Sequence, residues 1–129
     1  MNLTREQIIA IKTKGISENW SPKLPYSRDV IKLLKNNEGN YEFFDKHGKK
    51  IYVGSSEEIK HRVESYGELD DPKVHPTKVP LRQQLHNGGL FRFRYVPLDI
   101  ARKHEQRIKQ NLPFNMDSHI HEEEKKNGK

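Results

Sequence analysis

The residues that could do chemistry gather around one junction, where a strand-like segment leads through small residues into a helix-like segment. Gly54, Ser55 and Ser56 form this junction. Because the first turn of a helix presents backbone N–H groups without partners, a phosphate could be bound there. Many α+β proteins have the same junction without a ligand, so the pattern alone does not assign one.

Five more side chains are candidates. Tyr41 and Tyr52 lie in two adjacent strand-like segments, and Arg62 and Tyr66 are four residues apart, on one face of the following helix. Each has an ordinary structural explanation, since tyrosines are common in half-buried strands and an arginine can extend from the rim of a core. Glu105 projects beside the apolar arc of the last predicted helix, where a carboxylate needs an arginine partner or a metal ion.

The elements that position these residues can be predicted from periodicity. We expect a β-hairpin over residues 40–44 and 50–53, and then a helix near residues 57–66 that begins with a capping box from Ser55 to Glu58. Residues 91–95 alternate and predict a third strand, with aromatic side chains on one face and Arg92 and Arg94 on the other. Short and long helices are expected around residues 81–85 and 99–110, the latter with Ile100, Ala101, Ile108 and Leu112 along its apolar arc.

The two ends of the chain differ from this middle part. Residues 1–38 predict a helical extension, with one helix over residues 4–14, a loop over residues 16–26 and a second helix from Ser27 through Lys35. Residues 116–129 predict a flexible polar tail. The expected fold class is therefore α+β, a three-stranded antiparallel sheet flanked by helices with an extra N-terminal helical segment.

Composition limits the classes of protein that this chain can represent. Its 129 residues carry 24 Lys and Arg against 18 Asp and Glu, a net charge of +6, with 32% hydrophobic residues and no cysteine. This length suits one domain, and the basic excess favours a polyanion such as nucleic acid. Without cysteine there are no disulfides, thiolate metal sites or cysteine nucleophiles. No apolar run approaches the roughly 20 residues that span a bilayer, so we expect a cytoplasmic protein without a membrane partner.

The order and spacing of the candidate residues resemble the GIY-YIG nuclease family. The resemblance rests on Gly39-Asn40-Tyr41, on Tyr52-Val53-Gly54 with Arg62 eight residues after the glycine and Tyr66 four later, and on Glu105 followed by Leu112-Pro113-Phe114-Asn115. It covers residues 39–115, the expected nuclease domain. It implies the same three-stranded fold and an enzyme that cuts phosphodiester bonds with a divalent metal, Mg²⁺ or Mn²⁺.

The resemblance also implies roles for individual residues. Glu105 matches the metal-binding carboxylate, Arg62 matches the arginine that stabilises phosphate charge, and Tyr41 and Tyr52 match residues that line the site, one of them activating water. Tyr66 matches a residue that hydrogen-bonds the phosphate or assists proton transfer. The remaining expected contributors support the site (Gly54, Ser55, His61, Asn115) or contact nucleic acid (Lys60, Arg92, Arg94).

Three departures from the family pattern bear on this interpretation. Asn40 replaces an apolar residue and needs a partner if it points into a core. Ser55 stands where many relatives have lysine. The interval of ten residues from Glu105 to Asn115 is short, which makes His104 an alternative metal ligand.

The prediction is a divalent-metal-dependent endonuclease acting on DNA, with structured or nicked DNA favoured, RNA kept as an alternative and a protein partner as a possible source of specificity. The competing hypothesis is a catalytically inactive module of the same fold that binds nucleic acid. Phe91, Phe93 and Tyr95 could form a base-stacking platform, although core packing is favoured. His119, His121 and the acidic run at residues 122–124 could bind a metal, although a solvated tail is favoured.

Overall fold

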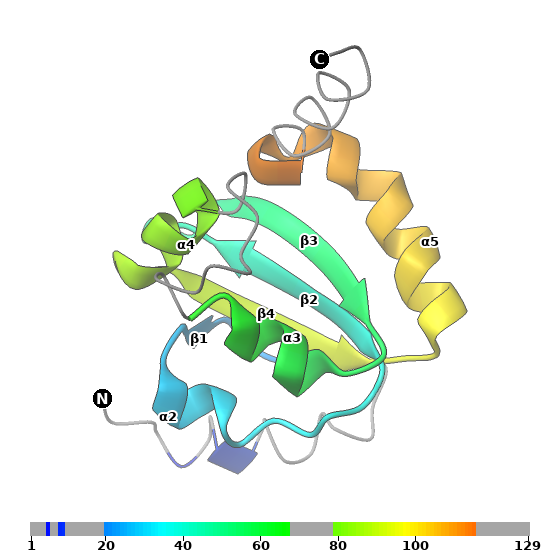
Figure 1. The fold of residues 1–129 in the computed structure, drawn as a ribbon, viewed down its shortest axis with the longest axis horizontal. Helices are drawn as coiled ribbons and strands as arrows, with labels where there is room; N and C mark the ends of the chain where they lie inside the picture. Colours follow the sequence, from blue (N-terminus) through cyan, green and yellow to red (C-terminus); the bar gives the residue numbers. More distant parts are fainter. Residues whose placement is uncertain (1–4, 6–7, 10–19, 68–78, 116–129) are drawn as a thin grey trace.

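The computed structural model describes residues 5, 8–9, 20–67 and 79–115. Its elements are shown in Figure 1, and a 3-10 helix, η2, follows the last α-helix. In chain order they are β1 (Leu24–Pro25), α2 (Arg28–Ile31), β2 (Gly39–Phe44), β3 (Lys50–Ser56), α3 (Ile59–Ser65), α4 (Val79–His86), β4 (Leu90–Tyr95), α5 (Leu98–Ile108) and η2 (Lys109–Asn111).

The strands form one antiparallel sheet in the order β1-β4-β2-β3. The predicted α+β class is confirmed, and so are the hairpin of β2 with β3 and the third strand β4. The sheet differs from the prediction in having a fourth strand, because Leu24 and Pro25 pair with Phe91 and Leu90 in a segment predicted as a loop. Proline suits this outer position because it has no N–H to donate to a further strand.

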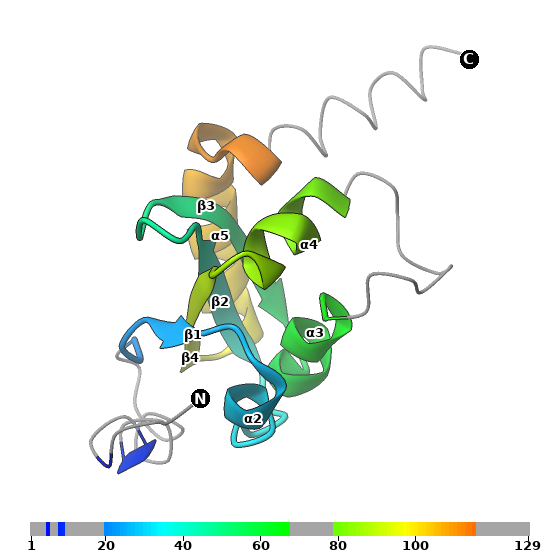
Figure 2. The same ribbon diagram turned by 90° about the vertical axis from the view of Figure 1, so that its left-hand side faces the viewer.

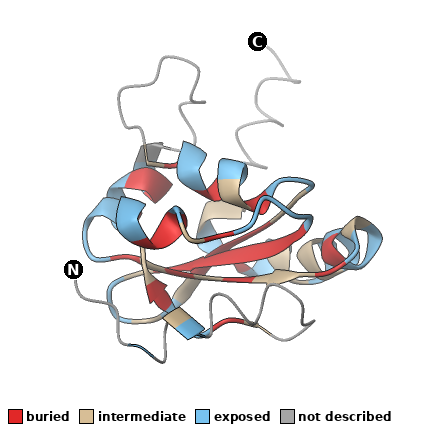
Figure 3. Cartoon of the chain, turned by 90° about the horizontal axis from the view of Figure 1, so that it is seen from below, coloured by how far each residue is buried: buried red, intermediate tan, exposed pale blue. Residues whose placement is uncertain are grey.

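The helices cover the two faces of the sheet unequally. Figure 1 shows α3 and α4 in front of the sheet, and in Figure 2 these two helices lie to its right, with α2 beside α3. In Figure 2, α5 lies behind the strands. We call the face under α3 and α4 the front face and the face under α5 the rear face. The front face carries the main hydrophobic core, to which the strands contribute alternate aromatic residues and the helices contribute aliphatic ones. Figure 3 shows how the buried residues follow the strands and the inner sides of the helices. Phe91 and Phe93 are fully buried in this core, which confirms the packing interpretation over the stacking platform.

Residues 20–38 pack into the same core as the rest of the described chain. Leu24, Val30, Ile31 and Leu34 are all buried in it. Ser27 caps α2 as predicted, since its side chain accepts a hydrogen bond from the backbone N–H of Val30 at 3.4 Å. The helix is shorter than predicted and ends at Ile31. The helix predicted over residues 4–14 falls almost wholly outside the described residues, as do the histidines of the predicted tail.

Two local predictions are wrong. Ser55 does not cap α3, because Ser55 and Ser56 are still paired with β2 at the end of β3; instead the Ser56 hydroxyl accepts from the Glu58 N–H at 2.9 Å. The backbone therefore stays extended until Glu58 and α3 begins at Ile59. Ile100 lies outside the buried side of α5 and is 41% exposed, whereas its neighbour Ala101 is fully buried.

Within the described part of the chain, no helix has the length and apolar character needed to cross a membrane.

Candidate active site

The three tyrosines predicted for the site lie together on the front face of the sheet. Tyr41 and Tyr52 point to the same side because Tyr41 pairs with Gly54 and Phe43 pairs with Tyr52 across β2 and β3. Tyr66 reaches them from the end of α3, and its hydroxyl oxygen lies 3.0 Å from that of Tyr41. The Tyr41–Tyr52, Tyr41–Tyr66 and Tyr52–Tyr66 ring centroids are 6.3, 6.0 and 6.1 Å apart. The fold thus brings β2, β3 and α3 to one hydroxyl cluster.

Gly54 makes this arrangement possible. A Cβ atom at this position would lie 2.2 Å from Cζ of Tyr41 and 2.3 Å from its hydroxyl oxygen. Those separations are far below the roughly 3.5–4.0 Å of an ordinary carbon contact. The Tyr41 ring therefore lies directly across the backbone of Gly54, and any side chain there would displace it. This gives a steric reason for glycine at the expected supporting position.

Burial sets the protonation state of the tyrosine cluster. Desolvation is the largest effect on all three hydroxyls and raises the pKa of Tyr41, Tyr52 and Tyr66 above the ordinary value of about 10. The neighbouring Arg62 cation lowers each pKa only in part. At neutral pH the three side chains are therefore neutral phenols that can donate hydrogen bonds.

Arg62 lies at the exposed border of this cluster. Its side chain is exposed, yet the guanidinium interacts electrostatically with Tyr41 most strongly, and also with Tyr66 and Tyr52. These interactions raise the pKa of the guanidinium further, so the charge is permanent. The result is an accessible cation beside buried hydroxyl donors, which is suited to binding a phosphate oxygen.

Glu105 approaches the same region from α5. Its carboxylate accepts a hydrogen bond from the Ser55 hydroxyl at 2.5 Å, and its charge acts on Tyr41 and Tyr52. Ser55 follows Gly54 in β3, so its side chain points to the opposite face, toward α5. Ser55 therefore holds the carboxylate at the β3 edge.

The residues present are compatible with a hard divalent cation bound by one protein ligand. Glu105 is only partly buried, and the described residues contain no group of three or more histidines, cysteines or carboxylates arranged to hold a metal. A metal here would depend on the Glu105 carboxylate, with waters and substrate oxygens as its other ligands. Mg²⁺ commonly binds in this manner.

His104, the alternative ligand, is engaged elsewhere. Its Nε2 lies 3.1 Å from Oε2 of Glu42, and its Nδ1 lies 3.0 Å from a terminal nitrogen of Arg107. Desolvation lowers the pKa of His104, with Arg94 and Arg107 acting in the same direction and Glu42 opposing them. The neutral ring satisfies both contacts when Nε2 carries the proton, since Nδ1 can then accept from Arg107. Of the two candidates, Glu105 is the one placed toward the tyrosines.

Asn115 supports the outer strand of the sheet. Its Oδ1 accepts from the Val53 N–H and its Nδ2 donates to the Val53 carbonyl, both at 3.0 Å. The amide thereby continues the hydrogen-bond pattern of a neighbouring strand beside β3, directly between Tyr52 and Gly54. The short interval from Glu105 does not prevent this contact, because η2 tightens the chain after α5.

Asn40, which replaces an apolar residue of the family pattern, has hydrogen-bond partners in the protein interior. Its amide is fully buried, donates to the carbonyls of Gly54 at 3.1 Å and Ala101 at 2.8 Å, and accepts from Nε of Arg94 at 3.1 Å. It therefore joins β2, β3, β4 and α5 at one point. An apolar residue would leave the two carbonyls without this donor.

The other predicted nucleic-acid contacts fall in two places. Lys60 and His61 lie on α3, where Lys60 is partly buried and His61 is exposed. Arg92 and Arg94 lie on the rear face, where Nε of Arg92 contacts the fully buried Glu42 at 2.6 Å. The structure thus separates the two arginines from the tyrosine cluster and gives them partners in the protein.

Comparison with known proteins gives a partial likeness. No family model matches the chain. The chain is 50% identical over 36 residues to UvrABC system protein C of Christiangramia forsetii, and 47% identical over 36 residues to that of Campylobacter jejuni subsp. doylei. UvrABC system protein C of Aliarcobacter butzleri is 37% identical over 49 residues. The matches cover 28–38% of this chain and only 6–8% of the relatives. They support a likeness to UvrABC system protein C over a short segment of the chain.

Proposed function

We propose that this chain is a GIY-YIG-type endonuclease that hydrolyses phosphodiester bonds in DNA with Mg²⁺ or Mn²⁺. The observation that carries the proposal is the convergence of Tyr41, Tyr52, Arg62, Tyr66 and Glu105 from four separate elements. The partial likeness to UvrABC system protein C adds support, although that protein is far longer than the matched segment.

Each residue has a task in this proposal that follows from its environment. Arg62 is exposed and permanently charged, so it binds the scissile phosphate and stabilises the charge that develops on it. Tyr41 and Tyr66 share a hydrogen bond and carry their protons at neutral pH, so they orient the attacking water or pass a proton along the pair. A divalent ion on Glu105 would supply Lewis-acid stabilisation of the leaving oxygen.

A second candidate is the inactive module that only binds nucleic acid. The observation that favours it is the depth of the tyrosines, because Tyr41, Tyr52 and Tyr66 are only 1%, 7% and 6% exposed. If the cluster serves packing alone, Arg62 and the basic surface could bind DNA without cutting it. The two proposals differ in their dependence on metal, since binding needs none.

The experiment compares cleavage with binding. Wild-type protein and Arg62→Ala are incubated with supercoiled plasmid, linear duplex, flap and four-way-junction DNA in Mg²⁺, Mn²⁺ or EDTA, with Arg28→Ala as a control that removes an exposed cation from α2. Cleavage that needs metal, persists in Arg28→Ala and is lost in Arg62→Ala supports the nuclease. Binding in EDTA without cleavage under any condition supports the inactive module.

A further inference from the structure

The rear face of the sheet carries a group of cations interleaved with aromatic rings, which the proposed cleavage site does not use. We call it the rear cationic cluster, and its members are Lys23, Lys50, Arg92, Arg94 and Arg107 together with Trp20 and Phe44. The strand residues face this side because Arg92 and Arg94 pair with Glu42 and Asn40 of β2, whose side chains alternate with that of Tyr41.

The aromatic rings hold the guanidinium groups in place. Cζ of Arg92 lies 4.4 Å and Cζ of Arg94 lies 4.7 Å from the centroid of the Trp20 ring. Beside them, Nζ of Lys23 lies 4.5 Å from the centroid of Phe44. Cation–π contacts of this kind hold the cationic groups in place in the free protein. Binding a ligand then costs less side-chain entropy, because these groups are already ordered. The cluster is therefore organised before any ligand arrives.

Among the described residues, the carboxylates near the cluster do not balance its charges. Glu42 is fully buried at the base of the cluster, where it contacts Lys50 at 3.0 Å and Arg92 at 2.6 Å. The nearby carboxylate of Asp45 is used by the backbone N–H groups of the β2–β3 turn. Asp45 keeps its negative charge in these contacts, so among the described residues two carboxylates stand against Lys23, Lys50, Arg92 and Arg107. This balance leaves an electropositive surface. The His104 ring is tilted against Trp20, with the ring centroids 5.4 Å apart, and adds a neutral ring.

We infer that the rear cationic cluster binds the phosphodiester backbone of nucleic acid, as a second contact separate from the tyrosine site. Cations interleaved with aromatic rings are typical of surfaces that follow a nucleic-acid backbone. A repeated phosphate chain can engage several fixed cations at once, which a single small anion cannot do. The inference rests on the proposed function only for the class of ligand, a nucleic acid, and does not require cleavage.

The chain contains one tryptophan, so Trp20 is a local probe of this surface. We would titrate the protein with a short DNA duplex in EDTA and record both Trp20 emission and the anisotropy of a label on the DNA. The inference predicts that the two signals change together and saturate at the same DNA concentration. A rise in anisotropy without any change in Trp20 emission would place binding elsewhere and overturn the inference.

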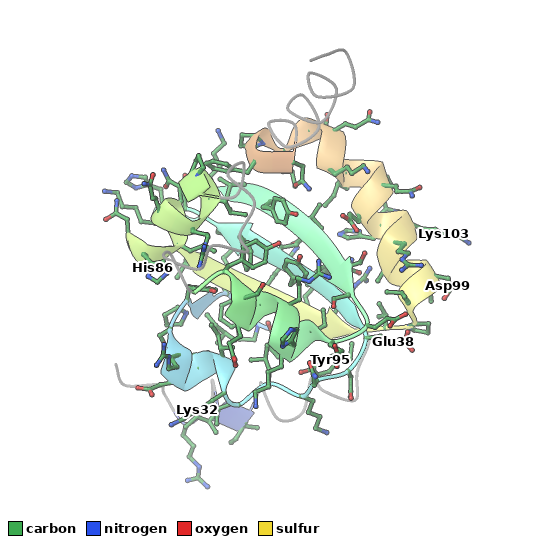
Figure 4. The ribbon with its side chains drawn as sticks, in the orientation of Figure 1. Lys32, Glu38, His86, Tyr95, Asp99 and Lys103 are labelled. Atoms are coloured by element: carbon green, nitrogen blue, oxygen red, sulfur yellow. The ribbon has the colours of Figure 1, made fainter. Side chains whose placement is uncertain are left out.

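A charge-matched pair of variants makes the test specific. Lys23→Gln with Arg107→Gln removes two exposed cations of the cluster, and Arg28→Gln with Lys32→Gln removes two exposed cations from α2. Figure 4 shows Lys32, the C-cap residue of α2, on the other side of the view from α5. Two lost phosphate contacts should lower the slope of log affinity against log salt by about 1.8 in the first variant only.

Three results would contradict the inference: equal slopes for the two double variants, an unchanged slope in the cluster variant, and a Trp20 response to vesicles of anionic lipid but not to DNA. Thermal melting of both variants keeps these outcomes interpretable, because all four substituted side chains are exposed and melting should be unchanged. Since no cleavage is measured, failure of the nuclease proposal would leave this test intact.

Discussion

Gly54→Ala tests the geometry of the tyrosine cluster at a single atom. The new Cβ would lie 2.2 Å from Cζ of Tyr41, so the ring must move by more than about 1 Å to reach an ordinary contact distance. Overpacking a core costs about 1–3 kcal/mol, and loss of the Tyr41–Tyr66 hydrogen bond costs about 1 kcal/mol more. We expect the free energy of unfolding to fall by about 2–4 kcal/mol, which is roughly 3–5 °C per kcal/mol in melting temperature for a domain of this size.

The assay is a double-mutant cycle in urea. Tyr41→Val removes the ring while keeping a residue suited to a strand, so Gly54→Ala should cost much less in that background than in the wild type. Gly67→Ala is the matched control, because its Cβ would come no closer than 3.2 Å to another atom. If Gly54→Ala is equally costly with and without the Tyr41 ring, the steric reasoning is wrong. On the nuclease proposal, the displaced ring should also slow cleavage about 100-fold.

Three further substitutions test other parts of the structure. Burial raises the pKa of the Glu42 carboxyl, but hydrogen bonds from His104, Arg92 and Lys50 outweigh this effect and the net pKa is lowered. The ionised carboxylate therefore stabilises the folded state. This stabilisation is present above the unfolded pKa of about 4.3 and is lost as pH falls through the folded pKa. Glu42→Gln should therefore reduce the free energy of unfolding at pH 7 by about 1–3 kcal/mol, a range that is discounted because Lys50 and Arg92 are partly exposed. The free energy of unfolding of the variant should also fall less steeply as the pH is lowered. Parallel pH profiles of the two proteins, measured by urea unfolding, would contradict this. Asn40→Ile restores the apolar residue of the family pattern, yet by removing a donor from two carbonyls it should cost about 2–4 kcal/mol in urea unfolding, and an unchanged stability would refute that role. Asn115→Ala should cost about 1–2 kcal/mol through the two lost contacts to Val53, and a melting temperature equal to that of wild type would show that the amide does not brace β3.

Periodicity predicted the parts of the fold that depend on local pattern. The hairpin and the alternation of β4 both follow from residues close together in the chain. It missed β1, because a strand of two residues has no period to detect. It also placed α3 two residues early, since pairing of Ser55 and Ser56 with β2 outweighed their tendency to cap a helix.

The sequence predicts which residues form the candidate site but not how they are supported. Asn40 and Glu42 are polar side chains in a strand, and nothing local shows that α5 and Trp20 cover their side of the sheet. Their burial depends on partners about 60 residues away, such as Ala101 and His104. For the same reason the sequence predicts Arg92 and Arg94 as nucleic-acid contacts without showing that Glu42 and Asn40 hold their Nε groups.

The most direct test of the central claim is the single-turnover rate of DNA cleavage by Glu105→Gln. Asp99→Asn is the control, because it makes the same charge change at an exposed position on α5, and Figure 4 shows Asp99 at the outer side of that helix. The account predicts that wild type and Asp99→Asn cut DNA in Mg²⁺ and not in EDTA, while Glu105→Gln is slower by about 100-fold or more. Cleavage by Glu105→Gln at the wild-type rate, or cleavage that persists in EDTA, would contradict it.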